Sequence, residues 1–308
     1  MIKLGYRDNG SIIHRLNPFC KLTWVLSVFV LSIIVYNPLF LALVFISTLP
    51  VVVASKLARE WASFMKLALL LCLLVIIVNV LVSNEGEHIL VEAPFSIPVI
   101  GIPVITLEAI FFGFAMSIKL LAIMSAFTVL TLTIHPDDMM QSMIKLRLPY
   151  KSVLVTSLST RFIPTLTGDL ERITDAQRSR GVELDSGGLF KRVRGYMTVL
   201  IPLLSNSLDR TVQVAEAMES RAFGSKSKRT FYKGITLSGF DLAALFISFL
   251  PIALAVYMVI GGYGDYEYYP TVSGLSLALS EWTILSVVVT TLPSIVLLGF
   301  LKRRIDLD

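Results

Sequence analysis

The sequence predicts an all-α membrane protein with about six transmembrane helices and, between the fourth and fifth of them, long amphipathic helices outside the bilayer. The 308 residues are 55% hydrophobic and only 16% charged, and their mean hydropathy is +0.76. This composition is far more apolar than that of a soluble domain. Apolar runs of roughly 20 residues, the length that crosses a bilayer, recur along the chain. Basic residues gather in some of the connections and are absent from others, as in membrane proteins.

The individual spans are predicted from the length of the apolar runs and from turn residues. Residues 20–55 form one apolar region, but a single helix rising about 1.5 Å per residue would far exceed a hydrocarbon core of roughly 30 Å. Asn37-Pro38 is typical of a turn within this region, so we expect a helical hairpin. The predicted spans are 20–36, 38–55, 64–83, 106–134, 240–262 and 280–301.

The distribution of basic residues predicts the orientation of these spans, because Lys and Arg accumulate in cytoplasmic connections. Sixteen basic residues lie within 135–239, whereas the connections 84–105 and 263–279 contain none. Both chain termini and the segment 135–239 are therefore predicted to be cytoplasmic. The stretch 89–105 is apolar, but it contains Glu92 and three prolines, which argue against a seventh span. We expect an outer loop there.

Three regions follow from this topology. Residues 1–134 form a membrane domain with four spans, residues 135–239 form a cytoplasmic scaffold, and residues 240–308 add two spans and a basic tail. The net charge of +5 is explained by a basic cytoplasmic face beside the anionic lipid bilayer. No nucleic-acid partner is therefore predicted.

The segment between the fourth and fifth spans is predicted to form three helices, 135–147, 150–180 and 189–222. Pro164 and Pro202 lie inside the two longer helices and should kink them. Both long helices carry an apolar stripe at spacings of three and four residues. The stripes comprise Leu154, Leu158, Phe162, Leu166, Leu170 and Ile173, and then Val193, Met197, Leu200, Leu204, Leu208, Val212, Ala215 and Met218. Such stripes can be buried against each other or against the underside of the spans.

A repeated motif ends the two long helices. DAQRSRG at 175–181 and EAMESRAFG at 216–224 share the pattern [DE]-A-x-x-S-R-[GA]. Arg180 and Arg221 lie in the last turn of their helices, where a cation complements the helix dipole by about 0.3–1 kcal/mol. Dipole complementarity alone is one explanation for either arginine taken singly.

The rest of the repeat favours a second explanation. Gly181 and Gly224 are suited to end the helices in a left-handed conformation. Dipole complementarity does not require the other small residues that both copies share, which are Ala176, Ala217, Ser179, Ser220 and Ala222. Small residues around one arginine allow a helix end to enter a groove. Two such ends indicate two similar sockets, as in a dimer of related partner subunits.

No catalytic or metal site is predicted. The phosphate loop G-x-x-x-x-G-K-[ST] does not occur, and GSKSKRT at 224–230 lacks its glycine spacing. The three histidines are far apart in sequence, which argues against a shared metal or a histidine-based reaction. Cys20 and Cys72 show the spacing of neither a disulfide framework nor a zinc site. We therefore expect a protein that is not an enzyme and binds no cofactor.

Four segments, taken together, are typical of one family. They are HRLNPFCKL at 14–22, TLTIHPDDMMQSMIKLRLPY at 131–150, RFIPTLTGDLERITDAQRSRG at 161–181 and EAMESRAFG at 216–224. These segments resemble the transmembrane T component of energy-coupling factor (ECF) transporters, a family of vitamin and transition-metal importers that includes the CbiQ-type proteins. The resemblance spans nearly the whole chain and is strongest over 119–224.

The resemblance implies a role for each repeated motif. Ser179-Arg180-Gly181 and Ser220-Arg221-Ala222 would each dock into a groove on one of two ABC-type ATPase subunits, with Ala176, Ala217, Arg161 and Pro164 as supporting residues of the same segments. Family members usually read Ala-Arg-Gly, so the serines and Ala222 are mild departures. The family also commonly has Pro-Arg-Thr-Lys at the position of Pro18-Phe19-Cys20-Lys21.

The resemblance further implies a separate membrane protein, the S component, which binds the substrate and contacts the apolar faces of 150–180 and 189–222. ATP and Mg²⁺ would be bound by the ATPases, and the complex would lie in the plasma membrane of a prokaryotic cell. Closure of the paired ATPases on ATP would shift the two arginine-bearing ends and so move the S component.

Lys119 is a charged residue inside the fourth predicted span. A charge at membrane depth is costly and by default suggests function. The lysine can also snorkel, or reach Glu108 about three turns away through water or a neighbouring helix. Because the family often has a basic residue in this part of the chain, we favour a packing or partner-interface role over a substrate path.

Two other functions compete with an importer subunit. A secondary transporter or channel would place several polar residues in the membrane midplane, whereas here they cluster in the predicted cytoplasmic segment. A membrane scaffold for proteins unrelated to ATPases would bind through the same helices without sensitivity to nucleotide.

Overall fold

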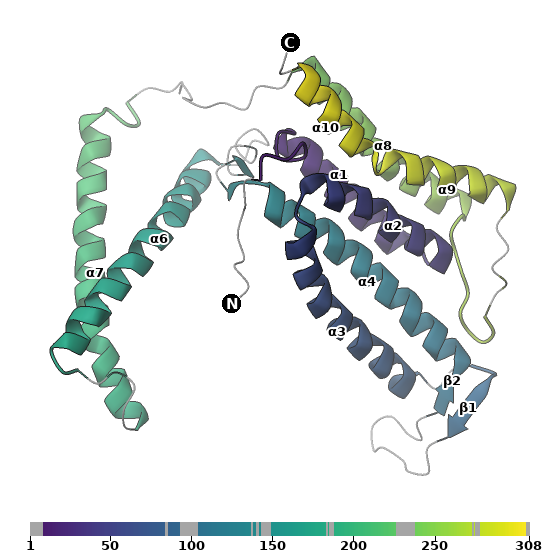
Figure 1. Ribbon diagram of the computed structural model, residues 1–308, viewed down its shortest axis with the longest axis horizontal. Helices are drawn as coiled ribbons and strands as arrows, with labels where there is room; N and C mark the ends of the chain where they lie inside the picture. Colours follow the sequence, from purple (N-terminus) through teal and green to yellow (C-terminus); the bar gives the residue numbers. More distant parts are fainter. Residues whose placement is uncertain are drawn as a thin grey trace. The chain divides into compact units, whose positions relative to one another are not determined.

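The computed structural model describes residues 9–83, 86–92, 104–136, 138–139, 142, 149–182, 184, 188–225, 238–272, 274 and 278–305 (Figure 1). The chain divides into two compact units, Met1–Met139 with Thr236–Asp308, and Met140–Ile235. The first unit holds the apolar helices, and the second holds two long amphipathic helices.

The described residues of the first unit form seven helices. They are α1 (Pro18–Ile34), α2 (Pro38–Ser55), α3 (Ala58–Val82), α4 (Leu107–Thr133), α8 (Gly239–Gly261), α9 (Leu279–Thr291) and α10 (Ser294–Ile305). The turn expected between the first two helices is present. Asn17 and Asn37 precede α1 and α2, each with proline as the next residue, and their side chains accept the N–H groups of Phe19 and Leu39. The N–H group of the first helical residue has no acceptor within the helix, so proline, which has no N–H, is well suited to this position. Each Asn-Pro pair therefore starts a helix.

Within the described part of the chain, five segments are long and apolar enough to cross a membrane. They are Pro38–Ser55, Ala58–Val82, Leu107–Thr133, Gly239–Gly261 and Leu279–Lys302. The first predicted span forms an apolar helix, Pro18–Ile34, but at 17 residues it is shorter than the other five. The protein is therefore an all-α, multi-pass membrane protein.

The last span is interrupted, which the hydropathy pattern did not predict. Helix α9 ends at Thr291 and α10 begins at Ser294, with Leu292 and Pro293 between them. At the break, the N–H of Val296 donates to the carbonyl of Pro293 at 2.9 Å and not to that of Leu292, so the Leu292 carbonyl needs another partner. The indole N–H of Trp24 in α1 donates to the carbonyl of Leu292 at 2.8 Å, inside the core.

Small polar side chains join the helices of this unit. The Thr48 and Ser125 hydroxyls lie 2.8 Å apart, and the indole N–H of Trp61 donates to Ser125 at 3.0 Å. Ser27 donates to the carbonyl of Ser248 at 2.6 Å. Such contacts link α4 to α2 and α3, and α1 to α8, as expected where lipid supplies no hydrophobic force between helices.

The segment before α1 contacts the end of α4. Lys21 is buried, and its ammonium group donates to the carbonyl of Thr133 at 2.9 Å and to that of His14 at 3.2 Å. Thr133 is the last residue of α4, so the lysine satisfies a carbonyl group left without a helical partner. The positive charge also complements the C-terminal end of the helix dipole.

The same segment contacts the start of α8. Asp241 accepts hydrogen bonds from Lys302 at 2.9 Å and from the Asn17 side chain at 3.4 Å, and it caps α8 together with Ser238. The Cys20 thiol lies 3.7 Å from the carbonyl of Asp241. Residues 14–21 are thus bonded both to the last residue of α4 and to the first turn of α8.

A short β-hairpin replaces part of the expected outer loop. Strand β1 (Ile89–Glu92) pairs antiparallel with β2 (Val104–Thr106), and residues 93–103 lie outside the described part of the chain. The hairpin leads directly into α4, whose first turn is capped by the Thr106 hydroxyl. Glu108, fully buried, bonds the ring of His88 at 2.7 Å and its backbone N–H at 3.3 Å, which holds the hairpin against α4.

The segment after α8 covers the turn between α1 and α2. The backbone N–H groups of Tyr36 and Asn37 donate to the carbonyl of Gly264 at 3.1 and 3.2 Å. The Tyr268 hydroxyl donates to the carbonyl of Tyr36 at 2.6 Å. Burial raises the pKa of Tyr268, and the neighbouring Tyr266 adds to the rise. The phenol therefore stays protonated and able to donate.

Among the described residues, the second unit contains α6 (Tyr150–Ser179) and α7 (Leu189–Ser220), which pack against each other with opposite directions. Their bounds agree with the predicted 150–180 and 189–222. Pro164 and Pro202 lie within continuous helices. The helix predicted over 135–147 falls largely outside the described residues.

The apolar stripe predicted for α7 does not face α6. Val193, Leu204 and Leu208 are 55%, 62% and 66% exposed. Burial of the two stripes against each other is therefore wrong for α7. The buried residue of α7 is instead Val199, 1% exposed, and Arg210 of α7 forms an ion pair with Asp169 of α6.

Candidate functional site

The end of α6 has a defined backbone geometry. The N–H of Gly181 donates to the carbonyl of Arg178 at 3.0 Å, and that of Val182 donates to the carbonyl of Gln177 at 3.1 Å. These two bonds define the Schellman motif, with Arg180 as the C-cap residue. Gly181 has φ +83°, the left-handed conformation expected for it.

The end of α7 repeats this geometry at the equivalent residues. The N–H of Ala222 donates to the carbonyl of Glu219 at 2.8 Å, and that of Phe223 donates to the carbonyl of Met218 at 3.0 Å. Arg221 is the C-cap residue. The two arginines therefore leave the same backbone turn in both copies of the motif.

One detail of the α7 end differs from expectation. The left-handed residue that closes this helix is Ala222, with φ +55°, and Gly224 has its positive φ of +91° two residues later. The left-handed region costs a residue with a Cβ roughly 1–2 kcal/mol. Ala222 therefore adopts this conformation at an energetic cost that Gly181 does not bear.

The side chains of both motifs are exposed. Ser179 and Ser220 bond back to carbonyls of their own helices at 2.9 and 3.1 Å. In the described part of the chain, no side chain pairs with the guanidinium of Arg180 or of Arg221. Ala176 and Ala217 are exposed beside them. Each helix end thus presents an exposed arginine at the C-cap with small residues on both sides of it.

An open hollow of about 500 Å³ lies beside the α7 motif, bounded by Ala215, Met218, Glu219, Ala222, Phe223 and Ser225. Phe223 is 42% exposed there. Met218 and Phe223 occupy the C3 and C″ positions of the Schellman motif. An apolar contact between these two positions often accompanies the motif. An apolar surface therefore borders the cation at this end.

The two helices are joined by charged side chains that the sequence analysis did not identify. Asp169 of α6 pairs with Arg210 of α7 at 2.9 Å and with Arg172 of its own helix at 2.7 Å. The Gln177 amide donates to the carbonyl of Thr198 in α7 at 3.2 Å. The sequence contains one indication of this pair. Asp169 and Arg210, which have opposite charges, stand at the same distance before Arg180 and Arg221 of the repeat.

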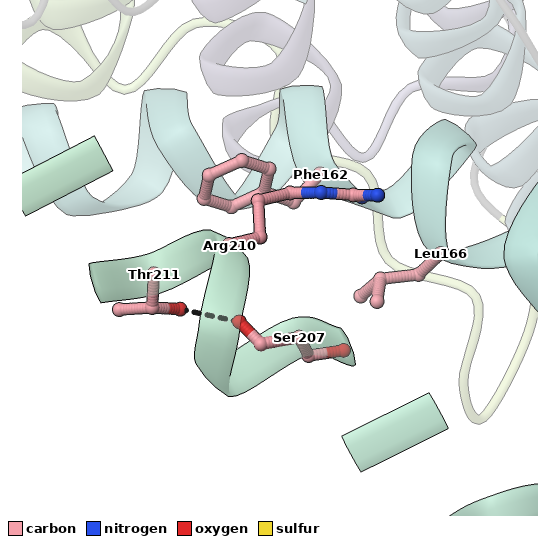
Figure 2. A pocket seen from close by; sticks show the side chains of 5 residues that line it. All are labelled: Phe162, Leu166, Ser207, Arg210 and Thr211. Atoms are coloured by element: carbon pink, nitrogen blue, oxygen red, sulfur yellow. Dashed lines mark hydrogen bonds between the residues drawn. The ribbon is translucent and has the colours of Figure 1, made fainter. Parts of the chain in front are cut away.

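A small hollow of about 170 Å³ borders this contact (Figure 2). Phe162 and Leu166 of α6 line it together with Ser207, Arg210 and Thr211 of α7. Figure 2 shows Leu166 extending toward the α7 residues, and the Thr211 hydroxyl donating to the carbonyl of Ser207 at 2.8 Å. The apolar contact between the helices is therefore incomplete beside Arg210.

The other predicted site residues lie apart from the motifs. Arg161 and Pro164 are exposed on α6, roughly five and four turns before Arg180 at 3.6 residues per turn. Lys119 lies in α4, where its ammonium group donates to the carbonyl of Ile33 at 3.3 Å and sits 4.3 Å from the centre of the Tyr36 ring. Lys119 thus has packing partners at the end of α1, and Glu108 is paired with His88 instead.

The described residues contain no cluster of three or more His, Cys, Asp or Glu that would hold a metal ion. Cys20 and Cys72 are buried free thiols in α1 and α3. The distinctive feature of the second unit is the pair of exposed helix ends.

Comparison with known proteins places the chain in a family. The profile of the CbiQ family, described as cobalt transport protein, matches residues 9–232. The energy-coupling factor transporter transmembrane protein EcfT of Bacillus selenitireducens is 30% identical over 260 residues, covering 82% of this chain and 94% of that protein. EcfT of Lactococcus lactis is 32% identical over 242 residues, covering 76% and 88%.

A third relative has a different architecture. A putative ABC transporter ATP-binding protein of Bifidobacterium longum is 30% identical over 258 residues, which cover 80% of this chain but only 32% of that longer protein. The family profile and the EcfT relatives agree over most of the chain. This chain therefore belongs to the CbiQ family, as a transmembrane T component of the energy-coupling factor transporters.

Proposed function

We propose that this protein is the transmembrane energy-coupling subunit of an ABC-type importer for a vitamin or a transition-metal ion. It transmits ATP-driven motion from two cytoplasmic ATPase subunits to a membrane S component that binds the substrate. The observation that carries the proposal is the pair of exposed helix ends, which present Arg180 and Arg221 from the same backbone turn.

The ends of α6 and α7 form the same backbone turn, which suits binding to similar grooves on two related ATPase subunits. Each arginine extends from a helix end flanked by an exposed serine and an exposed alanine or glycine, so little side-chain bulk blocks its approach to a groove. A relative that is named as an ATP-binding protein contains a region similar to this chain within a longer polypeptide. That combination supports a functional link between this kind of membrane protein and ATPases.

The chain itself acts mechanically. ATP and Mg²⁺ bind to the ATPases, and this subunit catalyses no reaction. Closure of the ATPases moves the ends of α6 and α7, and the exposed apolar face of α7 supplies a surface for the S component. In this arrangement the second unit and both chain termini are cytoplasmic, which agrees with the sixteen basic residues within 135–239.

Co-purification tests the proposal. The tagged chain is purified in mild detergent, and bound proteins are identified for wild type, Arg180→Glu, Arg221→Glu and the double variant. We expect ATPase subunits with wild type, fewer with each single variant and none with the double variant. Arg192→Glu, which alters another exposed cation of α7, is the matched control and should retain the ATPases.

Absence of ATPases from the purified complex would contradict the proposal. If no protein with a phosphate loop accompanies the folded wild-type chain, the coupling function is wrong. A secondary transporter or channel, active without ATPases, would then explain the spans better.

A further inference from the structure

The ends of α6 and α7 share one backbone turn but differ in chemistry at three of the positions around it. Because both turns are Schellman motifs with an arginine at the C-cap, positions at equal distances from the two arginines can be compared directly. Two residues before the arginine stand Arg178 and Glu219, three residues before it stand Gln177 and Met218, and two residues after it stand Val182 and Phe223.

The first difference reverses a charge. Arg178 and Glu219 are both exposed. Residues 175–182 contain one acid and two arginines, whereas residues 216–223 contain two acids and one arginine, so their net charges are +1 and −1. A groove that accepts an arginine side chain offers oxygen acceptors, most strongly carboxylates. Such a groove attracts the α6 end more strongly than the α7 end.

Glu219 does not serve the stability of α7. It lies in the last turn of the helix, where the negative end of the helix dipole disfavours a carboxylate. Arg178, at the equivalent position of α6, complements the dipole instead. A residue that breaks a local stability rule is expected where its side chain serves binding.

The other two differences concern apolar surface. The amide of Gln177 donates to the carbonyl of Thr198 in α7 at 3.2 Å, and Val182 is half-buried. At the other end, Phe223 is 42% exposed and lines, together with Met218, the open hollow of about 500 Å³. The α7 end therefore offers a larger apolar surface to a partner than the α6 end does.

We propose that the two ends bind their ATPase subunits through different interactions. The α6 end binds mainly by charge, through Arg178 and Arg180. The α7 end binds through Arg221 and through an apolar contact, in which Met218 and Phe223 receive an apolar side chain of the ATPase groove. This inference rests on the proposed function and adds the chemistry of each of its two contacts.

Continuity with Arg221 identifies the ATPase as the partner of this apolar surface. Phe223 follows Arg221 by two residues and belongs to the same turn, because its N–H donates to the carbonyl of Met218 at 3.0 Å. A groove that encloses the guanidinium therefore also reaches the Phe223 side chain. Arginine and large aromatic side chains are the residue types that most often dominate the binding energy of an interface.

The two kinds of contact respond differently to salt. The distance over which charges attract falls from about 10 Å at about 0.1 M salt to about 3 Å at about 1 M. Apolar contacts are not screened in this way. Charges at the edge of an interface act mainly on the association rate and its salt dependence, whereas buried contacts slow dissociation. The α7 end should therefore stay bound in high salt, and the α6 end should be released.

Single-end variants separate the two contacts. Arg180→Glu leaves the α7 end as the docking end, and Arg221→Glu leaves the α6 end. Each tagged full-length chain is purified with its ATPases in mild detergent at about 0.1 M NaCl, immobilised, and washed at about 1 M NaCl. Quantitative mass spectrometry measures the ATPase that remains per chain. We expect Arg180→Glu to retain about ten-fold more of its ATPase through the wash than Arg221→Glu.

Substitutions at equivalent positions are matched controls. Phe223→Ala, combined with Arg180→Glu, should reduce capture about ten-fold at both salt concentrations. Val182→Ala, combined with Arg221→Glu, should change capture by less than about two-fold. Arg178→Glu, combined with Arg221→Glu, should reduce capture at low salt and remove most of its dependence on salt.

A conservative variant distinguishes loss of the contact from loss of the fold. Phe223→Leu keeps an apolar side chain and should retain most of the capture, and thermal unfolding of the membrane protein should be unchanged in every variant. The proposal is overturned if the salt wash removes equal fractions of ATPase from the two single-end variants. It is also overturned if Phe223→Ala leaves capture by the α7 end unchanged.

Failure of this inference is distinguishable from failure of the proposed function. If wild type captures ATPases and its two ends respond alike to salt, the coupling function stands and only the difference between the contacts is wrong. If wild type captures no ATPase at any salt concentration, both are wrong.

Discussion

Replacing Ala222 by glycine should tighten the C-terminal end of α7. Ala222 has φ +55°, and relief of the left-handed conformation is worth roughly 1–2 kcal/mol. Glycine loses more backbone entropy on ordering, which offsets roughly 0.5–1 kcal/mol. The net gain is about 0.5–1 kcal/mol, a factor of about two to five in the local opening equilibrium.

The reverse change at the other motif is the control. Gly181→Ala places a Cβ at φ +83°, and that Cβ meets no atom within 4 Å, so its cost comes from the backbone alone. We expect a loss of about the same size there, because the two ends share one backbone turn.

Amide hydrogen exchange of the full chain in nanodiscs measures both effects. The peptide containing the Ala222 and Phe223 amides should exchange more slowly in Ala222→Gly, and the peptide containing the Gly181 and Val182 amides should exchange faster in Gly181→Ala. Faster exchange at the α7 end in Ala222→Gly would refute the argument from backbone strain. Unchanged exchange in Gly181→Ala would refute the equivalence of the two turns.

Three further substitutions test contacts of the membrane unit. Lys21→Met leaves the last carbonyl of α4 without its donor, so thermal unfolding in detergent should show a loss of about 1–3 kcal/mol; an equal loss in the exposed control Lys66→Met would contradict this. Lys119→Met should cost about 1 kcal/mol and leave ATPase capture intact; normal stability with abolished uptake would instead support a substrate path. The pKa of Tyr268 is raised by burial, so its phenol ionises first in the unfolded chain, and stability should fall as pH rises above about 10. Tyr268→Phe should reduce this alkaline sensitivity, measured as unfolding temperature against pH, and an undiminished sensitivity would count against the assignment.

Local sequence patterns predicted most of the helices and both motif ends. Asn37-Pro38 marked the turn between α1 and α2 because asparagine caps a helix and proline starts one, and both effects act within a few residues. Arg180 and Arg221 were expected at helix ends for a similar reason. The cap and the small residues lie within one turn of the chain, whereas the left-handed residue that closes α7 is Ala222 and not the expected Gly224.

Features that depend on tertiary contacts were missed. The break at Pro293 is hidden in an apolar run, since hydropathy does not report whether a partner such as Trp24 exists for the freed carbonyl. The stripe of α7 was identified, but its orientation depends on where α6 crosses. Asp169 and Arg210 are separated by 41 residues, and only the crossing of the helices brings them together.

The segment 14–21 has a mechanical consequence for the membrane unit. The chain leaves this unit after α4 and returns to it at α8. Lys21 holds the last residue of α4, and Asn17 holds Asp241 in the first turn of α8. A force that pulls on either connection is thus delivered to the same eight residues. Residues 14–21 thus link the end of α4 to the start of α8. If this segment were shortened, each of the two helix ends could move independently of the other.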